Sequence, residues 1–211
     1  KVLTPSKDRV EPKCPVARQC GGCQIQEMRY EAQLAFKQKM VQNNLERIGG
    51  LSDFEMYPVI GMETPYAYRN KAQFPVGEDK DGNIVIGFYA GRTHHIVEQT
   101  DCCIGAPENG EVLRKVKAYM QKNQIRPYNE EHHSGIVRHI LIRTGYHTKE
   151  IMVCLIVNAA KASCLKNAEQ LTESLREMDG MTSVMVNFNT EKTNVILGKK
   201  SEVLWGQPYI E

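Results

Sequence analysis

The stretch Cys14-Pro15-Val16-Ala17-Arg18-Gln19-Cys20-Gly21-Gly22-Cys23-Gln24, called the cysteine loop below, places three cysteines near the start of a 211-residue chain. Only two glycines separate its second cysteine from its third. Thiolates are the ligands of iron–sulfur clusters and of structural zinc, and this short gap lets both sulfurs reach one centre. Glycine has no Cβ, so the backbone can pass close to that centre. The loop therefore predicts an inorganic centre that anchors the N-terminal arm to the folded body.

Core packing and disulfide bonding fit these cysteines less well. Free cysteines often pack as small apolar side chains, but three of them within ten positions make poor core patterning. A disulfide framework is typical of an even number of cysteines behind a secretory leader, whereas this chain holds seven cysteines and opens without a leader pattern. We therefore expect a reducing compartment, the cytoplasm.

A closed four-ligand site needs one further cysteine from elsewhere in the chain. Cys154 lies in an apolar run typical of a buried strand, and Cys164 lies near the start of a helical pattern. Cys102 and Cys103 lie in a connection between a strand-like run and a helix start, and connections usually present ligands. The residues alone leave both members of this pair open, and we place Cys102 first.

The composition is typical of a soluble globular protein, with 41% apolar and 25% charged residues. No stretch approaches the roughly 20 apolar residues of a transmembrane helix, so we expect no membrane partner. A net charge of +2 is too small to indicate a nucleic-acid partner by itself. Any such prediction must come from local basic clusters.

We expect three parts along the chain: a polar linker and the cysteine loop in residues 1–26, a long connecting helix in residues 27–50, and a central domain in residues 51–211. Leu34, Val41, Leu45 and Ile48 fall near helical spacing, and Gly49 follows them as a stop signal. The linker-like start and the end directly after a strand pattern indicate a portion of a longer protein.

The central domain is expected to be α+β, with helices packed on an antiparallel sheet. The Asp81-Gly82 turn signal joins two strand-like runs into a hairpin. Helices are expected over residues 107–123 and 163–178, and strands over 57–62, 66–77, 84–89, 95–99, 136–144, 150–158, 181–189 and 194–205.

Basic residues in the first of these hairpins are the candidates for RNA binding. Arg69 and Lys71 share one parity, so a strand places both on one face. Together with Arg92 they could contact phosphates, and Tyr66 and Tyr68 could stack on unpaired bases. A solvated sheet face is the frequent alternative cause of such a pattern.

Several motifs, in order, resemble those of the RNA uracil-5 methyltransferases of the 23S rRNA (uracil-5-)-methyltransferase type. The cysteine loop is similar to the cluster motif of that family, and Tyr68-Arg69-Asn70-Lys71 resembles its basic segment. Further similar stretches are Gly87-Phe88-Tyr89, the run from Ile96 through Cys102 to Pro107, and Gly135-Ile136-Val137-Arg138-His139. The resemblance spans essentially the whole chain, and its cysteine part is specific.

The resemblance implies that Cys14, Cys20, Cys23 and Cys102 hold a structural [4Fe–4S] cluster. It also implies an oligonucleotide-binding barrel before this portion and a catalytic domain that binds S-adenosylmethionine after it. None of the family's catalytic residues can be carried onto this chain. This portion is therefore expected to be a monomer that binds the cluster and RNA, with ribosomal RNA as the expected partner, and to be inactive alone.

Two rival functions remain open for the same residues. A structural zinc-binding adaptor module would use the two-residue cysteine gap equally well. An electron-transfer protein is less favoured, because the chain lacks a compact four-cysteine run and has a large predicted sheet.

Overall fold

The computed structural model describes residues 2–211 and separates into two compact units. The first unit holds the residues up to Arg18 together with Cys23–Pro65. The second holds Gln19–Gly22 together with Tyr66–Glu211. The tip of the cysteine loop thus belongs to the unit that contains the sheet, while its two arms belong to the other.

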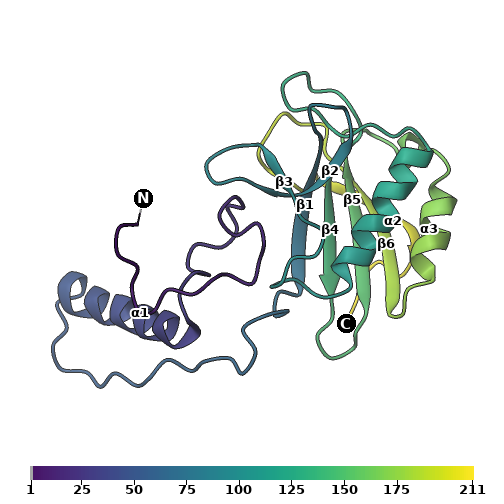
Figure 1. The fold of residues 1–211 in the computed structure, drawn as a ribbon. Coiled ribbons are helices and arrows are strands. Elements are labelled where there is room, and N and C mark those ends of the chain that lie inside the picture. The colour runs from purple at the N-terminus through teal and green to yellow at the C-terminus, as the bar shows by residue number, and fades with distance from the viewer. Residues whose placement is uncertain (1) are drawn as a thin grey trace. The chain divides into compact units, whose positions relative to one another are not determined.

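The first unit contains one helix, α1 (Tyr30–Asn43), which continues as a short π-helix, η1 (Asn44–Ile48) (Figure 1). The helix begins at Tyr30 rather than at residue 27, because the preceding residues form an antiparallel bridge between Arg9 and Met28. None of the described residues of α1 or η1 is buried. The apolar spacing that predicts the helix therefore does not give it a buried face.

The strand expected over residues 57–62 does not form. The segment contacts the helix through a hydrogen bond from the N–H of Met62 to the Tyr30 hydroxyl at 2.7 Å and through the close approach of Gly61 to Leu34. An isolated extended segment with no neighbouring strand cannot build a ladder.

The second unit is a seven-stranded sheet in the order β3-β2-β1-β4-β5-β6-β7. All of its neighbouring strand pairs except β5–β6 are antiparallel. The strands are β1 (Lys71–Glu78), β2 (Ile84–Tyr89), β3 (Ile96–Glu98), β4 (Val137–Thr144), β5 (Ile151–Val157), β6 (Met181–Phe188) and β7 (Lys200–Gly206).

The expectation of an antiparallel sheet is wrong for one pair, since β5 and β6 run parallel. A parallel pair needs a long crossover, usually a helix. Here the crossover contains a 3₁₀ turn, η2 (Ala162–Cys164), and the helix α3 (Ala168–Arg176). The sheet is therefore mixed, although the expected layering of helices on a sheet is present.

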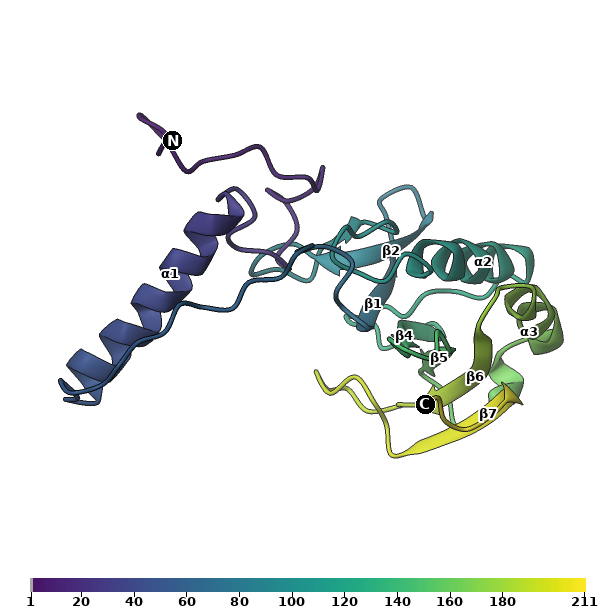
Figure 2. The same ribbon diagram turned by 90° about the horizontal axis from the view of Figure 1, so that it is seen from below.

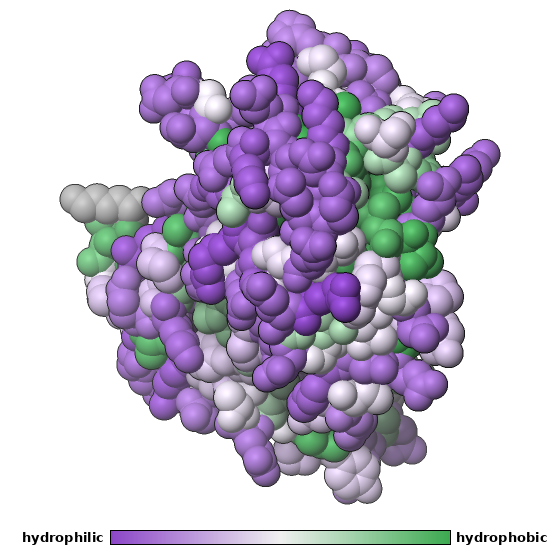
Figure 3. Space-filling model, turned by 90° about the vertical axis from the view of Figure 1, so that its right-hand side faces the viewer, coloured by the Kyte–Doolittle hydropathy of each residue, from purple (hydrophilic) through white to green (hydrophobic). Residues whose placement is uncertain are grey.

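The helices α2 (Asn109–Lys122) and α3 lie side by side on one face of the sheet (Figures 1 and 2). The largest fully buried side chains of this layer come from strands and helices alike: Phe74, Ile86, Leu113, Met120, Ile140, Leu155, Leu171 and Leu175. The outward surface on this side is mostly hydrophilic (Figure 3). On the opposite sheet face a small cluster of Leu141, Cys154 and Ile156 packs against Met185 and Ile196.

Helix boundaries differ from the expected ones at their N-terminal ends. α3 begins at Ala168 rather than at residue 163, because Asn167 adopts a left-handed conformation with φ of 52° that interrupts the helical turn. α2 begins at Asn109, two residues after Pro107. In the described part of the chain, none of the helices combines the length and apolarity needed to cross a membrane.

Arg138 is a buried arginine in β4 that holds the connection after β6. Its guanidinium donates to the carbonyl oxygens of Asn189, Glu191 and Thr193 at 2.8, 2.7 and 3.1 Å. It also lies 4.5 Å from the ring centroid of Tyr128. The Arg138 side chain, and not a neighbouring strand, provides the hydrogen-bond donors for these carbonyls. The last strand was expected to begin at residue 194, and this arrangement explains why it begins at residue 200.

We predict that Arg138→Met lowers the free energy of unfolding by about 3 kcal/mol, because three carbonyls lose a charged donor. Arg143→Met is the matched control in the same strand, and its exposed side chain should change stability by less than about 0.5 kcal/mol. Urea unfolding of both variants measures the difference. Equal losses in the two variants would contradict the assigned role of Arg138.

His139 follows Arg138 and is only 9% exposed. Burial lowers the pKa of His139 to about 4; Arg138 also lowers it, whereas Glu130 acts in the opposite direction. The imidazole is therefore neutral at pH 7. Its Nδ1 atom has no hydrogen-bond partner among the described residues.

We predict that His139 makes the fold less stable in acid. Between pH 6.5 and 4 the unfolded chain binds a proton that the folded chain does not, so stability falls as the pH falls. The loss should reach about 3 kcal/mol near pH 4. The free energy of unfolding, measured at pH 7 and pH 4, should fall by about 3 kcal/mol more in the wild type than in His139→Gln, because carboxylates with lowered pKa values destabilise both proteins in acid. Parallel pH profiles would refute it.

Candidate cysteine site and RNA-binding surface

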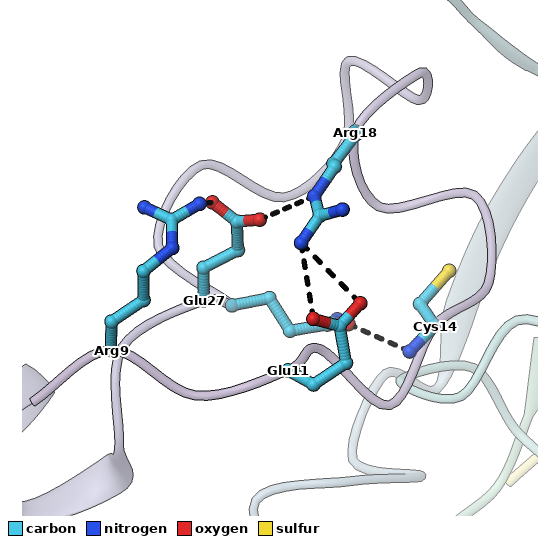
Figure 4. Close-up of polar contacts among 6 residues, drawn as sticks. Arg9, Glu11, Cys14, Arg18 and Glu27 are labelled. Carbon is cyan, nitrogen blue, oxygen red and sulfur yellow. Dashed lines mark hydrogen bonds and ion pairs between the residues drawn. The ribbon is translucent and has the colours of Figure 1, made fainter. Parts of the chain in front are cut away.

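The arms of the cysteine loop are held by a cluster of ion pairs (Figure 4). Glu27 accepts hydrogen bonds from both Arg9 and Arg18, the latter at 2.6 Å, and Arg18 also pairs with Glu11 at 3.1 Å. The hydrogen bond from Arg18 lowers the pKa of Glu27. Because these side chains are partly exposed, the cluster contributes little stability. The cluster links Arg9 and Glu11, which precede the loop, to Glu27, which follows it.

Backbone pairing closes the base of the same loop. The N–H of Val10 donates to the carbonyl of Glu27, and the N–H of Arg29 donates to the carbonyl of Asp8, both at 2.9 Å. Cys14 is buried within this unit, and its N–H donates to the side-chain oxygen of Gln26 at 2.9 Å. The first cysteine of the loop is thus held at a defined position.

The tip of the loop packs against the turn between β2 and β3. Cys20 forms an antiparallel bridge with Ala90, and the N–H of Gly21 donates to the carbonyl of Tyr89 at 2.9 Å. A Cβ on Gly21 would lie 3.0 Å from the Cα of Gly91, tighter than an ordinary Cβ contact. Glycine therefore favours this close contact with another backbone, a reason that the sequence alone does not reveal.

The sulfur of Cys20 also receives a hydrogen bond from its own loop. The N–H of Gly22 lies 3.4 Å from the Cys20 Sγ atom. A backbone donor of this kind stabilises a thiolate and is one of the features that tune iron–sulfur ligands. Cys20 is half-buried and lies outside both apolar clusters, and its role as a ligand stays a prediction.

Cys102 and Cys103 lie in the connection between β3 and α2, and both are partly exposed. The carbonyl of Cys102 accepts from the N–H of Gly105 at 2.9 Å, and the carbonyl of Cys103 accepts from the N–H of Ala67 at 3.0 Å. The first bond closes the turn itself, and the second ties the turn to the segment that leads into β1. Backbone pairing does not distinguish between the two cysteines as ligands.

The predicted ligands are divided between the units: Cys14 and Cys23 lie in the first, and Cys20 and Cys102 lie in the second. Within residues 2–211, no group of three or more cysteine, histidine or acidic side chains has an arrangement that could hold a metal ion. The set of four cysteine ligands stays a prediction.

The remaining two cysteines have surroundings unsuited to ligands. Cys154 is a buried residue of β5, as expected, and burial raises its pKa to about 12. Burial also raises the pKa of Cys164. Both thiols stay protonated at neutral pH, whereas metal ligands and nucleophiles are thiolates.

The candidate RNA-binding residues Arg69, Lys71 and Arg92 are all exposed and all lie in the second unit. Arg69 forms a parallel bridge with Gly105, Lys71 opens β1, and Arg92 lies in the turn between β2 and β3 with φ of 62°. Tyr68 is 48% exposed, so its ring is open to stacking.

The structure adds Arg143, which the sequence did not single out for RNA binding. Arg143 is the direct cross-strand partner of Lys71 in the β1–β4 pair, and its side chain is exposed. Like charges directly opposite each other are destabilising. In the described part of the chain, no carboxylate forms an ion pair with Arg69, Lys71, Arg92 or Arg143. The repulsion between Lys71 and Arg143 would therefore be relieved by an external anion, such as an RNA phosphate.

The chain is similar to several curated proteins along nearly its whole length. It is 46% identical over 210 residues to an uncharacterised RNA methyltransferase of Halalkalibacterium halodurans, covering 99% of this chain and 45% of that protein. It is 43% identical over 210 residues to an uncharacterised RNA methyltransferase of Clostridium tetani, again covering 99% of this chain and 45% of the relative. The chain thus spans less than half the length of these relatives.

A solved structure has a similar fold. The Pyrococcus abyssi tRNA (uracil-54, C5)-methyltransferase, determined with S-adenosyl-L-homocysteine, superposes with a TM-score of 0.72 at 25% identity. The match covers 100% of this chain and 44% of that one. No family model matches the sequence.

Proposed function

We propose that this chain is part of an S-adenosylmethionine-dependent RNA uracil-C5 methyltransferase and that this portion binds RNA and an iron–sulfur cluster. The observation that carries the proposal is the similarity, over 99% of the chain, to proteins named as RNA methyltransferases. The similarity of fold to a tRNA uracil-C5 methyltransferase supports the proposal that the modified base is uracil and that the methyl donor is S-adenosylmethionine.

Cys14, Cys20, Cys23 and Cys102 would hold a [4Fe–4S] cluster in this proposal. The donor set fits in chemistry, because Cys20 receives a backbone N–H and the excluded Cys154 has a strongly raised pKa. When bound, such a cluster would supply a structural cross-link between distant segments of the chain.

Methyl transfer itself would use residues outside this portion. The family resemblance implies a thiolate that attacks C6 of the uracil, but burial keeps Cys154 and Cys164 protonated, and the other five cysteines are the loop and its candidate partners. The role of this portion would be to hold RNA through Arg69, Lys71, Arg92 and Arg143, and to help present a flipped-out base.

The proposed substrate is ribosomal RNA, as the resemblance to the 23S rRNA type implies. The solved neighbour is named as acting on tRNA. Binding to a 23S rRNA fragment and to a tRNA transcript, compared at equal salt, distinguishes the two. Tighter binding of the tRNA would reject the ribosomal assignment.

For RNA binding, we predict that Lys71→Ala weakens binding of all RNA sequences alike. The slope of the logarithm of the affinity against the logarithm of the salt concentration should fall in magnitude by about one. The matched control is Lys122→Ala, because Lys122 is an exposed residue at the end of α2 on the helical side. Fluorescence anisotropy across a series of salt concentrations measures both effects. Identical salt slopes for the two variants would exclude Lys71 from the interface.

For the cluster, we predict that anaerobically purified protein is brown, absorbs broadly near about 400 nm and contains iron and acid-labile sulfide. Cys20→Ser should lower the iron content sharply, while Cys164→Ser should leave it unchanged. Serine variants of Cys102 and Cys103, compared in the same assay, identify the fourth ligand. A colourless protein with stoichiometric zinc would reject the cluster and favour the zinc adaptor module.

A further inference from the structure

A pocket of about 350 Å³ opens in the second unit. β1, β2 and β4 contribute to its floor, including Val85 and His139, and the segment after α2 contributes Tyr128 and Glu130. His139 alternates along β4 with the core residue Ile140, so it points away from the helices. The pocket therefore lies on the sheet face that the helices leave uncovered.

Aromatic rings line much of this pocket. Tyr89 and His94 lie with ring centroids 5.4 Å apart, and Tyr128 is buried beneath the Arg138 guanidinium. Aromatic side chains of this kind offer flat surfaces on which unpaired bases stack. A planar aromatic ligand suits these walls better than a flexible aliphatic one.

Two nearly buried polar side chains in the pocket have atoms without a partner. The Nδ1 atom of His139 and the Nε atom of Arg138 form no hydrogen bond with any described residue. Arg138 is 4% exposed and His139 is 9% exposed. Buried polar atoms are rarely left unpaired in folded proteins, and a bound ligand would satisfy these.

Carboxylates are numerous in the pocket. The carboxylates are Glu78, Asp79, Glu130 and Glu131. Asp79 is already used by the turn that it caps, where it accepts from Asn83, and Glu130 lies 2.6 Å from the His94 Nδ1 atom. Because His139 is neutral, it can add an acceptor without adding charge. A matching ligand therefore offers N–H donors to the carboxylates and an acceptor atom to the Arg138 Nε–H.

We propose that this pocket binds an unpaired nucleobase carrying an exocyclic amine, as in cytosine or adenine. The inference rests on the proposed RNA-binding function. Glu130 would accept from the amine, the Tyr89 hydroxyl and the unpaired Arg138 Nε–H would donate to acceptor atoms on the same edge of the base, and the rings would stack on the base. Uracil presents a carbonyl where the amine would be, so it pairs poorly with Glu130.

A neighbouring pocket offers a route for the rest of the nucleotide. It has a volume of about 330 Å³, shares Tyr128, Glu130 and Arg138 with the first pocket, and is bordered by Lys192. Lys192 is exposed and could contact the phosphate of a bound nucleotide. Glu130 would then face the base, and Lys192 would face the sugar-phosphate backbone of the RNA.

The test compares binding of labelled oligo(rC) and oligo(rU) of equal length to the 211-residue chain by fluorescence anisotropy. The two oligonucleotides have equal charge, so phosphate contacts cancel in the ratio of affinities. We expect oligo(rC) to bind about tenfold more tightly. Glu130→Gln should bring the ratio close to one, because an amide can also donate to the uracil carbonyl. Tyr89→Phe should lower the ratio, because phenylalanine cannot donate to a ring nitrogen, while Glu130 keeps part of the preference.

Controls separate this inference from RNA binding in general. Glu173→Gln, on the helical side, and Tyr146→Phe, in the β4–β5 turn, should keep the tenfold preference, and Lys71→Ala should weaken both oligonucleotides equally. Equal binding of rC and rU, with normal salt dependence, overturns the pocket and leaves the proposed function standing. A preference that survives both pocket variants also overturns it. Absence of binding to either oligonucleotide overturns both proposals.

Discussion

Burial of one sheet face beneath α2 and α3 is the constraint on which the second unit depends. Phe74, Ile140 and Leu155 point into that layer and are fully buried. Since side chains alternate along a strand, the residues between them must face the other way. The uncovered face therefore receives Lys71, Arg143 and His139, and it provides the surface for both the basic pair and the pocket.

A second constraint is the close approach of the cysteine loop to the β2–β3 turn. Gly21 contacts the backbone of this turn at a distance that leaves no ordinary space for a side chain. The same few residues contain Cys20, whose sulfur receives a backbone N–H. The tip of the loop is thus positioned by main-chain contacts, independently of any inorganic centre.

Both proposals depend on groups that cost stability in the isolated fold. The Lys71–Arg143 pair places like charges opposite each other, and the pocket leaves polar atoms of Arg138 and His139 unpaired. Unfavourable groups of this kind are expected at sites where a bound ligand compensates them. The anionic phosphates of RNA would compensate the Lys71–Arg143 pair, and an amine-bearing base would bind in the pocket.

The amino-acid sequence by itself determined most of the strands, the approximate helices and the identity of the candidate cysteines and basic residues. These follow from local periodicity, turn chemistry and residue type, which depend on near neighbours along the chain. Only the tertiary structure decided the parallel β5–β6 pair, the register that sets Arg143 beside Lys71 and the use of Arg138 to hold residues 189–193. These features join residues up to 72 positions apart, as Lys71 and Arg143 are, and no local pattern specifies such pairing because strand register is set by the shared core.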